Sequence, residues 1–196
     1  ELVELICSSK DIGLVGGRIY YAGNQNRIWF DGGKIEYDGN WKHINFNQID
    51  SGNVDNQITE TDWVTGCMML VDKNIFEEVR GFDPNYFLYV EDVDFCLRVR
   101  NAGYRIMHNP KSKIWHRIAG STEEGIRSPL RQYYMTRNQL LLISKDVWEF
   151  PYVASRVIFW LKLIIKGTFL LFRNIRFGYS YWLGIWDFIF NKFGEK

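Results

Sequence analysis

The chain has 196 residues, and its 24 Lys and Arg nearly balance 23 Asp and Glu, giving a formal net charge of +1. This length allows one domain with a buried core and a short appendage. The near-zero charge excludes a general nucleic-acid binder, which normally carries a basic excess. Aromatic residues make up 17% of the chain, with 8 Trp, which indicates a ring-lined groove, a membrane interface, or both.

The first third of the chain is predicted to be a short helix followed by strands. Residues 1–5 have the composition of a helix interior, and residues 13–21, 27–30 and 34–37 are rich in β-forming residues between Gly- and Asn-containing turns. Residues 47–61 are polar with no periodicity, which predicts a mobile surface loop. Cys7, Cys67 and Cys96 show no CxxC spacing, so we expect reduced and mostly buried thiols.

The next segment combines a turn, a strand and a helix. Trp63 and the pair Thr65-Gly66 precede the apolar run 68–71, which is typical of a buried strand. The turn is either an ordinary strand entry or a substrate contact, because Gly permits close backbone approach and Thr offers a hydroxyl. Asp72 is predicted to cap a helix over 73–80 that ends at Gly81.

Three carboxylates, Glu91, Asp92 and Asp94, follow an aromatic run at the start of a predicted helix. One acidic side chain is enough to satisfy a helix start, so three suggest a second task such as binding a hydroxyl or a cation. The alternative is a charged helix start in which Asp94 pairs with Arg98 at i,i+4. Gly103 is predicted to end this helix.

Two strands, split by a turn at 109–112, are predicted over 104–108 and 113–116. His116 ends the second strand beside a Gly- and Ser-containing loop, a reasonable position for a metal ligand. A helix is predicted over 124–145 with Arg137 and Asn138 on it. Arg137 is either a bidentate ligand of a diphosphate or an ordinary solvated side chain.

The composition changes at residue 146, where long apolar and aromatic runs begin. The run from 157 to 172 is shorter than the roughly 18 to 20 apolar residues that a membrane span needs. At about 100° per residue, Lys162, Lys166, Arg173 and Arg176 share one narrow arc. This pattern predicts helices that lie in a membrane interface, with a packed helical extension as the alternative.

Taken together, these motifs resemble the acceptor half of family 2 glycosyltransferases, the inverting GT-A type, and particularly the rhamnosyltransferase-like branch. The resemblance covers about residues 1 to 145. It rests on an ordered series of motifs: Trp63, Thr65-Gly66, Gly81-Phe82-Asp83, Glu91-Asp92-x-Asp94, Leu97-Arg98, Ala102-Gly103-Tyr104, His116 and Arg137-Asn138.

The resemblance implies an α/β fold, a partial GT-A-like mixed sheet with flanking helices. Together with the amphipathic pattern after residue 145, it divides the chain into an acceptor-side catalytic portion, 1–145, and an amphipathic helical tail at a membrane interface, 146–196. In the resembled family a nucleotide-binding half ends in an Asp-x-Asp metal motif before the point where Glu1 stands, and this sequence shows neither there. The spacing Asp92-x-Asp94 looks like that motif but belongs to the later acidic cluster. We therefore expect a C-terminal portion that is inactive alone, and a divalent cation, Mn or Mg, held mostly by the missing half.

The resemblance also implies roles for individual residues. Asp92 would be the catalytic base and Glu91 would orient it or bind acceptor hydroxyls, while His116 would help to bind the metal. The residues assigned to substrate binding are Trp63, Thr65, Gly66, Asp94, Arg137 and Asn138. The implied activity moves a sugar from a nucleotide-sugar to a hydroxyl of a glycan or lipid-linked acceptor, on the cytoplasmic face of the cell membrane and with no nucleic acid.

Two other classes of function are alternatives to this one. The first is a non-catalytic acceptor-binding or membrane-associated subunit that lacks the donor site. The second is a metal-dependent hydrolase, which fits less well because one His and three adjacent carboxylates cannot surround two metal ions.

Overall fold

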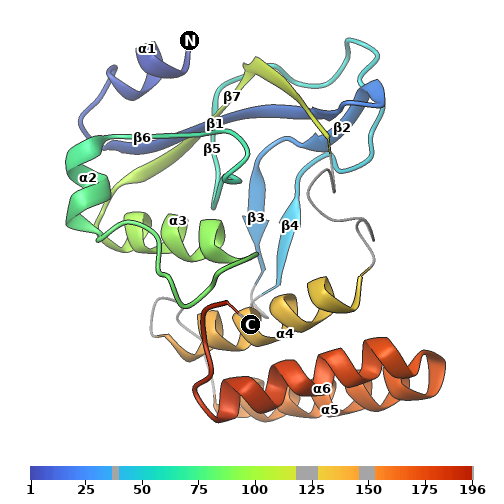
Figure 1. Cartoon of the computed structure of the whole chain (residues 1–196). Helices are drawn as coiled ribbons and strands as arrows, with labels where there is room; N and C mark the ends of the chain where they lie inside the picture. Colours follow the sequence, from blue (N-terminus) through green and yellow to red (C-terminus); the bar gives the residue numbers. More distant parts are fainter. Residues whose placement is uncertain (37–39, 118–127, 146–152, 196) are drawn as a thin grey trace. The chain divides into compact units, whose positions relative to one another are not determined.

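The computed structural model describes residues 1–36, 40–117, 128–145 and 153–195, and these form two compact units (Figure 1). The described part of unit 1 comprises 1–36, 40–82 and 92–117, and that of unit 2 comprises 83–91, 128–145 and 153–195. Residues 128–145 therefore belong to the same compact unit as the tail. The predicted boundary at residue 145 separates a catalytic portion from a tail by function, not by compactness, and stays a prediction.

Unit 1 is built on a five-stranded mixed sheet with the order β2-β1-β7-β5, in which β6 also pairs with β1. Its strands are β1 (Ile12–Tyr21), β2 (Asn24–Phe30), β5 (Thr59–Glu60), β6 (Met69–Val71) and β7 (Arg105–His116). β1 runs parallel to β7 and antiparallel to both β2 and β6. One edge of β1 serves two partners, because β6 pairs with residues 14–16 and β2 with residues 19–21.

β7 is a single strand, so the prediction of two strands split by a turn was wrong. Its pairing with β1 jumps from Gly17–Asn109 to Arg18–Lys113, which leaves residues 110–112 outside the ladder. Pro110 lies in this gap and has no N–H to donate, so an irregularity is tolerated here without ending the strand. A separate two-stranded ribbon consists of β3 (Gly33–Ile35) and β4 (Trp41–His43).

The helices associated with the sheet are α1 (Leu2–Ile6), α2 (Lys73–Glu78) and α3 (Glu91–Asn101). The first residue of α3, Glu91, is assigned to unit 2, and the rest of that helix to unit 1. α1 and α3 lie on opposite sides of the sheet in Figure 1. As predicted, the Asp72 carboxylate caps α2 by accepting from the N–H groups of Asn74 and Ile75. Gly81 and Gly103 both have positive φ, +61° and +94°, as expected of residues that follow a helix.

A buried charge network in unit 1 anchors part of residues 47–61, which are mostly exposed, as predicted for a surface loop. Arg18 on β1 donates to both oxygens of Asp31, at 2.6 and 3.2 Å, and to Asp50 at 3.3 Å and Asn56 at 3.1 Å. The Asp55 carbonyl accepts a further bond from the same guanidinium. This polar segment, which has no hydrophobic periodicity, is therefore held at Asp50, Asp55 and Asn56 by an arginine from a distant strand.

His108 on β7 adjoins this network, with Nε2 3.4 Å from Asp31 Oδ1. Burial lowers the pKa of His108 to about 4. Its imidazole is therefore neutral near pH 7, and the charge of Asp31 is balanced by Arg18.

Unit 2 contains three helices, α4 (Pro129–Ser144), α5 (Val153–Arg173) and α6 (Ile175–Ile189). Leu140 of α4, Leu163 of α5, and Tyr181 and Ile185 of α6 form one buried apolar cluster. A Cβ on Gly184 would come within 2.8 Å of the Tyr133 carbonyl oxygen. Glycine at this position therefore permits the close approach of α6 to α4.

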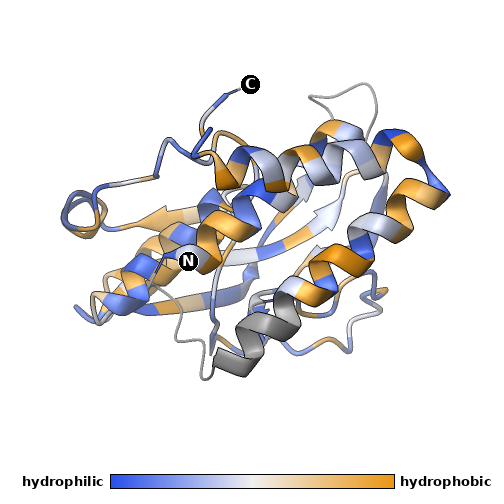
Figure 2. Cartoon of the chain, turned by 90° about the horizontal axis from the view of Figure 1, so that it is seen from below, coloured by the Kyte–Doolittle hydropathy of each residue, from blue (hydrophilic) through white to orange (hydrophobic). Residues whose placement is uncertain are grey.

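Asn174 separates α5 from α6 and caps the second helix through its side-chain oxygen, which accepts from the N–H groups of Arg176 and Phe177. Arg176 therefore lies on a different helix from Lys162, Lys166 and Arg173. The prediction of a single arc of four basic residues was wrong in this respect. In Figure 2, α5, which begins at its grey end, and α6 both carry hydrophobic residues along much of their described length.

The mixed α/β class is confirmed, and the described tail is helical. No helix among the described residues is both long and apolar enough to cross a membrane.

Candidate active site

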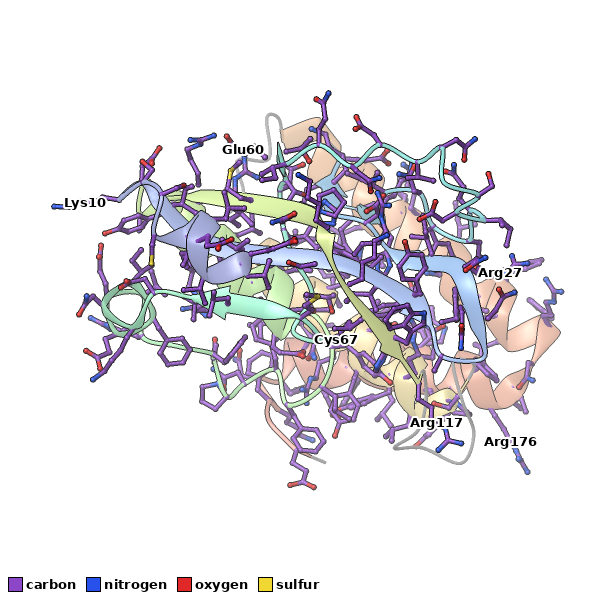
Figure 3. All side chains as sticks on the ribbon, turned by 90° about the horizontal axis from the view of Figure 1, so that it is seen from above. Lys10, Arg27, Glu60, Cys67, Arg117 and Arg176 are labelled. Carbon is purple, nitrogen blue, oxygen red and sulfur yellow. The ribbon has the colours of Figure 1, made fainter. Side chains whose placement is uncertain are left out.

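The turn Thr65-Gly66-Cys67 contacts two functional candidates from other parts of unit 1, Asp92 and His116. Cys67 is labelled in Figure 3. The Gly66 N–H donates to Asp92 Oδ2 at 3.1 Å, and the Thr65 side chain is also hydrogen-bonded to that carboxylate. Cys67 Sγ lies 3.7 Å from Nε2 of His116. The turn thus brings together residues from α3 and β7 that are far apart in the sequence.

Asp92 is the second residue of α3 and is half-buried, with Oδ1 accepting from the Val93 N–H at 2.9 Å. Burial raises the pKa of Asp92, while hydrogen bonds from Gly66, Val93 and Thr65 and the nearby His43 act in the opposite direction. A carboxylate that is oriented by several donors and more basic than usual is suited to accept a proton.

The other two carboxylates of the cluster differ from Asp92. Asp94 is completely buried, and its Oδ2 accepts from Arg98 Nε at 2.8 Å, which confirms the predicted i,i+4 pair. Arg98 also donates to the carbonyl of Val79, the residue after α2, so this ion pair links α3 to the C-terminal end of α2. The complete burial of Asp94 argues against the substrate contact assigned to it. Glu91 is half-buried as the first residue of α3, and its role stays a prediction.

Aromatic and histidine rings near this turn form a cluster that was not predicted from the sequence. His43 packs against the rings of Trp29, Phe30 and Trp63, with centroids 5.1, 5.1 and 5.3 Å away. Trp29 in turn lies 5.0 Å from the His116 ring. Because these rings come from four separate segments, no local pattern in the sequence indicates that they meet.

Trp63 is buried within this ring cluster, 2% exposed, which argues against the direct substrate contact assigned to it. A Cβ on Gly33 would lie only 2.2 Å from Trp63 Nε1, so the indole packs directly over the ribbon backbone. Its position indicates that Trp63 supports the turn that follows it.

His116 ends β7 as predicted and is half-buried, and burial lowers its pKa, which favours the neutral imidazole. Its near neighbours are Cys67 and Trp29. The described residues contain no group of three or more His, Cys, Asp or Glu that could hold a metal ion. Mn and Mg prefer several oxygen ligands. These residues therefore do not fit a complete cation site, and a ligand role for His116 stays a prediction.

The thiols also differ from the prediction of mostly buried cysteines. Cys96 is buried, and burial raises the pKa of its thiol, whereas Cys7 and Cys67 are exposed.

In unit 2, Arg137 and Asn138 are buried on α4, with exposed fractions of 1% and 0%. Arg137 Nη2 donates to the carbonyls of Asn85 and Tyr86, at 3.1 and 3.0 Å, and Nη1 donates to that of Gly194 at 2.9 Å. The guanidinium is therefore occupied by backbone acceptors. This geometry favours a supporting role over the predicted contact with a diphosphate. The alternative of a solvated side chain is wrong, because Arg137 is buried.

Comparison with known proteins identifies the class. The family described as "Glycosyl transferase family group 2" matches residues 1–191. The chain therefore belongs to this glycosyltransferase family.

Among curated proteins, the chain is 48% identical over 58 residues to the rhamnosyltransferase WbbL of Escherichia coli K12, which covers 30% of the chain and 22% of that protein. It is 36% identical over 86 residues to an N-acetylglucosaminyl-diphospho-decaprenol L-rhamnosyltransferase of Mycobacterium tuberculosis, which covers 44% of the chain and 28% of that protein. The chain thus spans about a quarter of the length of the curated relatives it matches.

One solved structure, described as GalNAc-T7 with UDP, GalNAc and Mn2+, is 13% identical and has a TM-score of 0.45 over 81% of the chain and 34% of its own.

Proposed function

We propose that the protein containing this chain transfers a sugar, with inversion, from a nucleotide-sugar to a hydroxyl group of a glycan or lipid-linked acceptor. The observation that carries the proposal is the Asp92 carboxylate, held by the Thr65-Gly66 turn and made more basic by burial, in a chain of glycosyltransferase family 2. The names of the relatives favour rhamnose as the sugar and a lipid diphosphate as the acceptor carrier.

The proposed reaction asks little of this chain. Asp92 accepts the proton of the acceptor hydroxyl while the acceptor oxygen forms a bond to the anomeric carbon. The bond from that carbon to the diphosphate oxygen breaks on the opposite face, and the nucleoside diphosphate leaves with the bonding electron pair. Asp92 then returns its proton to solvent. Glu91 would orient the acceptor, and no step is assigned to a cation, because the described residues do not form its site.

A transfer assay with the protein containing this chain tests the proposal. Radiolabelled dTDP-rhamnose and a membrane lipid extract are expected to give a labelled product that enters the organic phase. A labelled product that stays in the aqueous phase would show transfer to a different acceptor. Binding of acceptor lipid without transfer from any nucleotide-sugar would favour the non-catalytic acceptor-binding alternative.

The proposal includes a peripheral position on the inner face of the cell membrane, supported by the outer surface of α5. At about 100° per residue, Leu161, Ile165 and Phe172 lie on one arc, and they are 53, 68 and 89% exposed. Lys162 and Arg173 flank that arc and are exposed as well. An apolar surface beside basic side chains is typical of a helix that binds anionic lipid.

The expected result is binding of the chain to anionic vesicles, weakening as salt rises. Replacing Lys162, Lys166, Arg173 and Arg176 with Gln should reduce binding strongly, because each near-surface charge adds about 1 kcal/mol. Co-sedimentation with phosphatidylserine vesicles measures the effect. Trp160 and Trp186 are exposed and are expected at headgroup depth, whereas Trp182 packs in the unit 2 cluster and is not.

The matched control replaces four exposed lysines of unit 1 with Gln, namely Lys10, Lys34, Lys42 and Lys73. It removes the same charge and should leave vesicle binding nearly unchanged. Equal loss in both variants would mean that net charge alone drives binding, and a chain that stays in the supernatant at low salt would contradict the membrane proposal.

A further inference from the structure

The backbone segment that leads into the carboxylate cluster has an unusual conformation. Phe87, Tyr89 and Val90 have φ values of +59°, +66° and +73°, a region that L-residues other than Asn and Asp rarely occupy. The Leu88 N–H donates to the Tyr86 carbonyl at 2.8 Å, which makes Phe87 the centre of a γ-turn of the rare positive-φ form. Such a conformation persists only where its surroundings impose it.

The Asn138 side chain supplies hydrogen bonds that hold this segment. Its Nδ2 lies 2.8, 2.7 and 2.9 Å from the carbonyl oxygens of Tyr86, Leu88 and Tyr89. One amide group thus binds three acceptors that an extended or helical backbone could not direct at a single point. The contact selects the unusual conformation specifically, because it would be lost if the peptide groups turned.

Arg137 completes the arrangement from the same helix. It donates through Nε to the Asn138 side-chain oxygen at 3.0 Å, which fixes the amide with its Nδ2 toward the segment. It also donates to the carbonyls of Asn85 and Tyr86, at 3.1 and 3.0 Å, and to that of Gly194 at 2.9 Å. Because these bonds run in several directions from a buried guanidinium, a Lys cannot reproduce them.

We infer that Arg137 and Asn138 are positioning residues that hold residues 86–90 in the conformation which sets the start of α3, and with it Glu91 and Asp92, for the transfer reaction. The inference rests on the proposed function and replaces the assignment of these two residues to substrate binding. A covalent connection of one or two peptide units joins the held segment to the two carboxylates. A small displacement of a reacting group can lower the rate about a hundredfold.

The test compares Asn138→Ala with the parent protein in two measurements. Hydrogen–deuterium exchange of the N–H groups over residues 85–91 should become at least about tenfold faster, since the segment loses the amide that holds its peptide groups and opens to solvent more often. In the transfer assay, kcat should fall about ten- to a hundredfold while KM for the nucleotide-sugar changes less than about twofold. Arg137→Lys retains the buried charge and should show the same pattern in a protein that still folds.

Gln132→Ala is the control, because this residue lies on the same helix and its amide bonds Thr136 rather than the segment. It should leave exchange over 85–91 and kcat unchanged. A raised KM with normal kcat would show instead that Arg137 and Asn138 bind the donor diphosphate, and unchanged exchange, or faster exchange with unchanged kcat, would overturn the positioning role. A parent protein that transfers no sugar would refute the proposed function. Hydrogen–deuterium exchange needs no substrate, so it would still show whether Asn138 holds residues 86–90.

Discussion

Replacing Asp92 with Asn is expected to lower turnover at least about a hundredfold while nucleotide-sugar binding survives. Asn keeps the shape of the side chain and an oxygen that can accept from the Gly66 N–H, so the turn should remain in place. What the variant lacks is a group that can take the acceptor's proton. Initial rates at saturating donor, with the donor dissociation constant measured by calorimetry, separate the two effects.

The pH dependence of the parent protein provides a second measure of the same group. A base works in its ionised form, so kcat/KM should be high at neutral pH and fall as pH drops through the pKa of Asp92. Because burial raises that pKa, the fall should occur at higher pH than for an ordinary Asp, whose pKa is about 3.9. The Asn variant should lack this limb of the profile.

Asp94→Asn is the matched control, two residues along the same helix. It weakens the buried pair with Arg98 and should therefore lower stability more than it lowers turnover per folded molecule. Near-normal turnover in Asp92→Asn, or an equal loss of turnover in both variants, would show that Asp92 is not the base.

The largest effect on stability is expected at Arg18. Arg18→Met leaves Asp31 and Asp50 without their shared cation in the interior of unit 1. Removing one partner of a buried ion pair typically lowers the free energy of unfolding by about 3–5 kcal/mol. Urea unfolding, followed by Trp fluorescence, measures the change, and Asp31→Asn in the same background should recover part of it.

Arg105→Met serves as the control for this experiment. Arg105 also bonds two carboxylates, those of Asp11 and Glu60, but all three side chains are exposed. Pairs of that kind contribute about 0–1 kcal/mol. If both variants lost the same small amount, the Arg18 network would not be a principal source of stability.

The features that the sequence predicted correctly depend on partners a few residues apart. The Asp72 cap, the Asp94–Arg98 pair and the glycines after α2 and α3 each follow from spacings of one to four residues. Local geometry determines such contacts, so no knowledge of the fold is needed.

The site itself depends on contacts across many residues, and these could not be predicted. Gly66 reaches Asp92 over 26 positions, Cys67 reaches His116 over 49, and Asn138 reaches Tyr86 over 52. The burial of Arg137 could not be predicted for the same reason, because a buried and an exposed arginine look identical in a sequence. The family resemblance pointed to Thr65, Gly66, Asp92 and His116, which the structure brings together, but it could not distinguish reacting groups from those that support them.

The break between α5 and α6 could have been found from the sequence. Asn174 is a good N-cap residue, and its presence between two apolar runs indicates a new helix start. Treating the run as one helix placed Arg176 on an arc that the two helices do not share.

The order in which the chain emerges during synthesis constrains how these parts can assemble. The central strand β1 cannot complete its hydrogen bonds to β7 until residue 116 has been synthesised, so one edge of β1 stays unpaired while about half of the chain is made. Residues 86–90 wait longer, because Asn138 and the Gly194 carbonyl bound by Arg137 come later still. The backbone that leads into the carboxylates is therefore among the last parts of the molecule to acquire its fixed form.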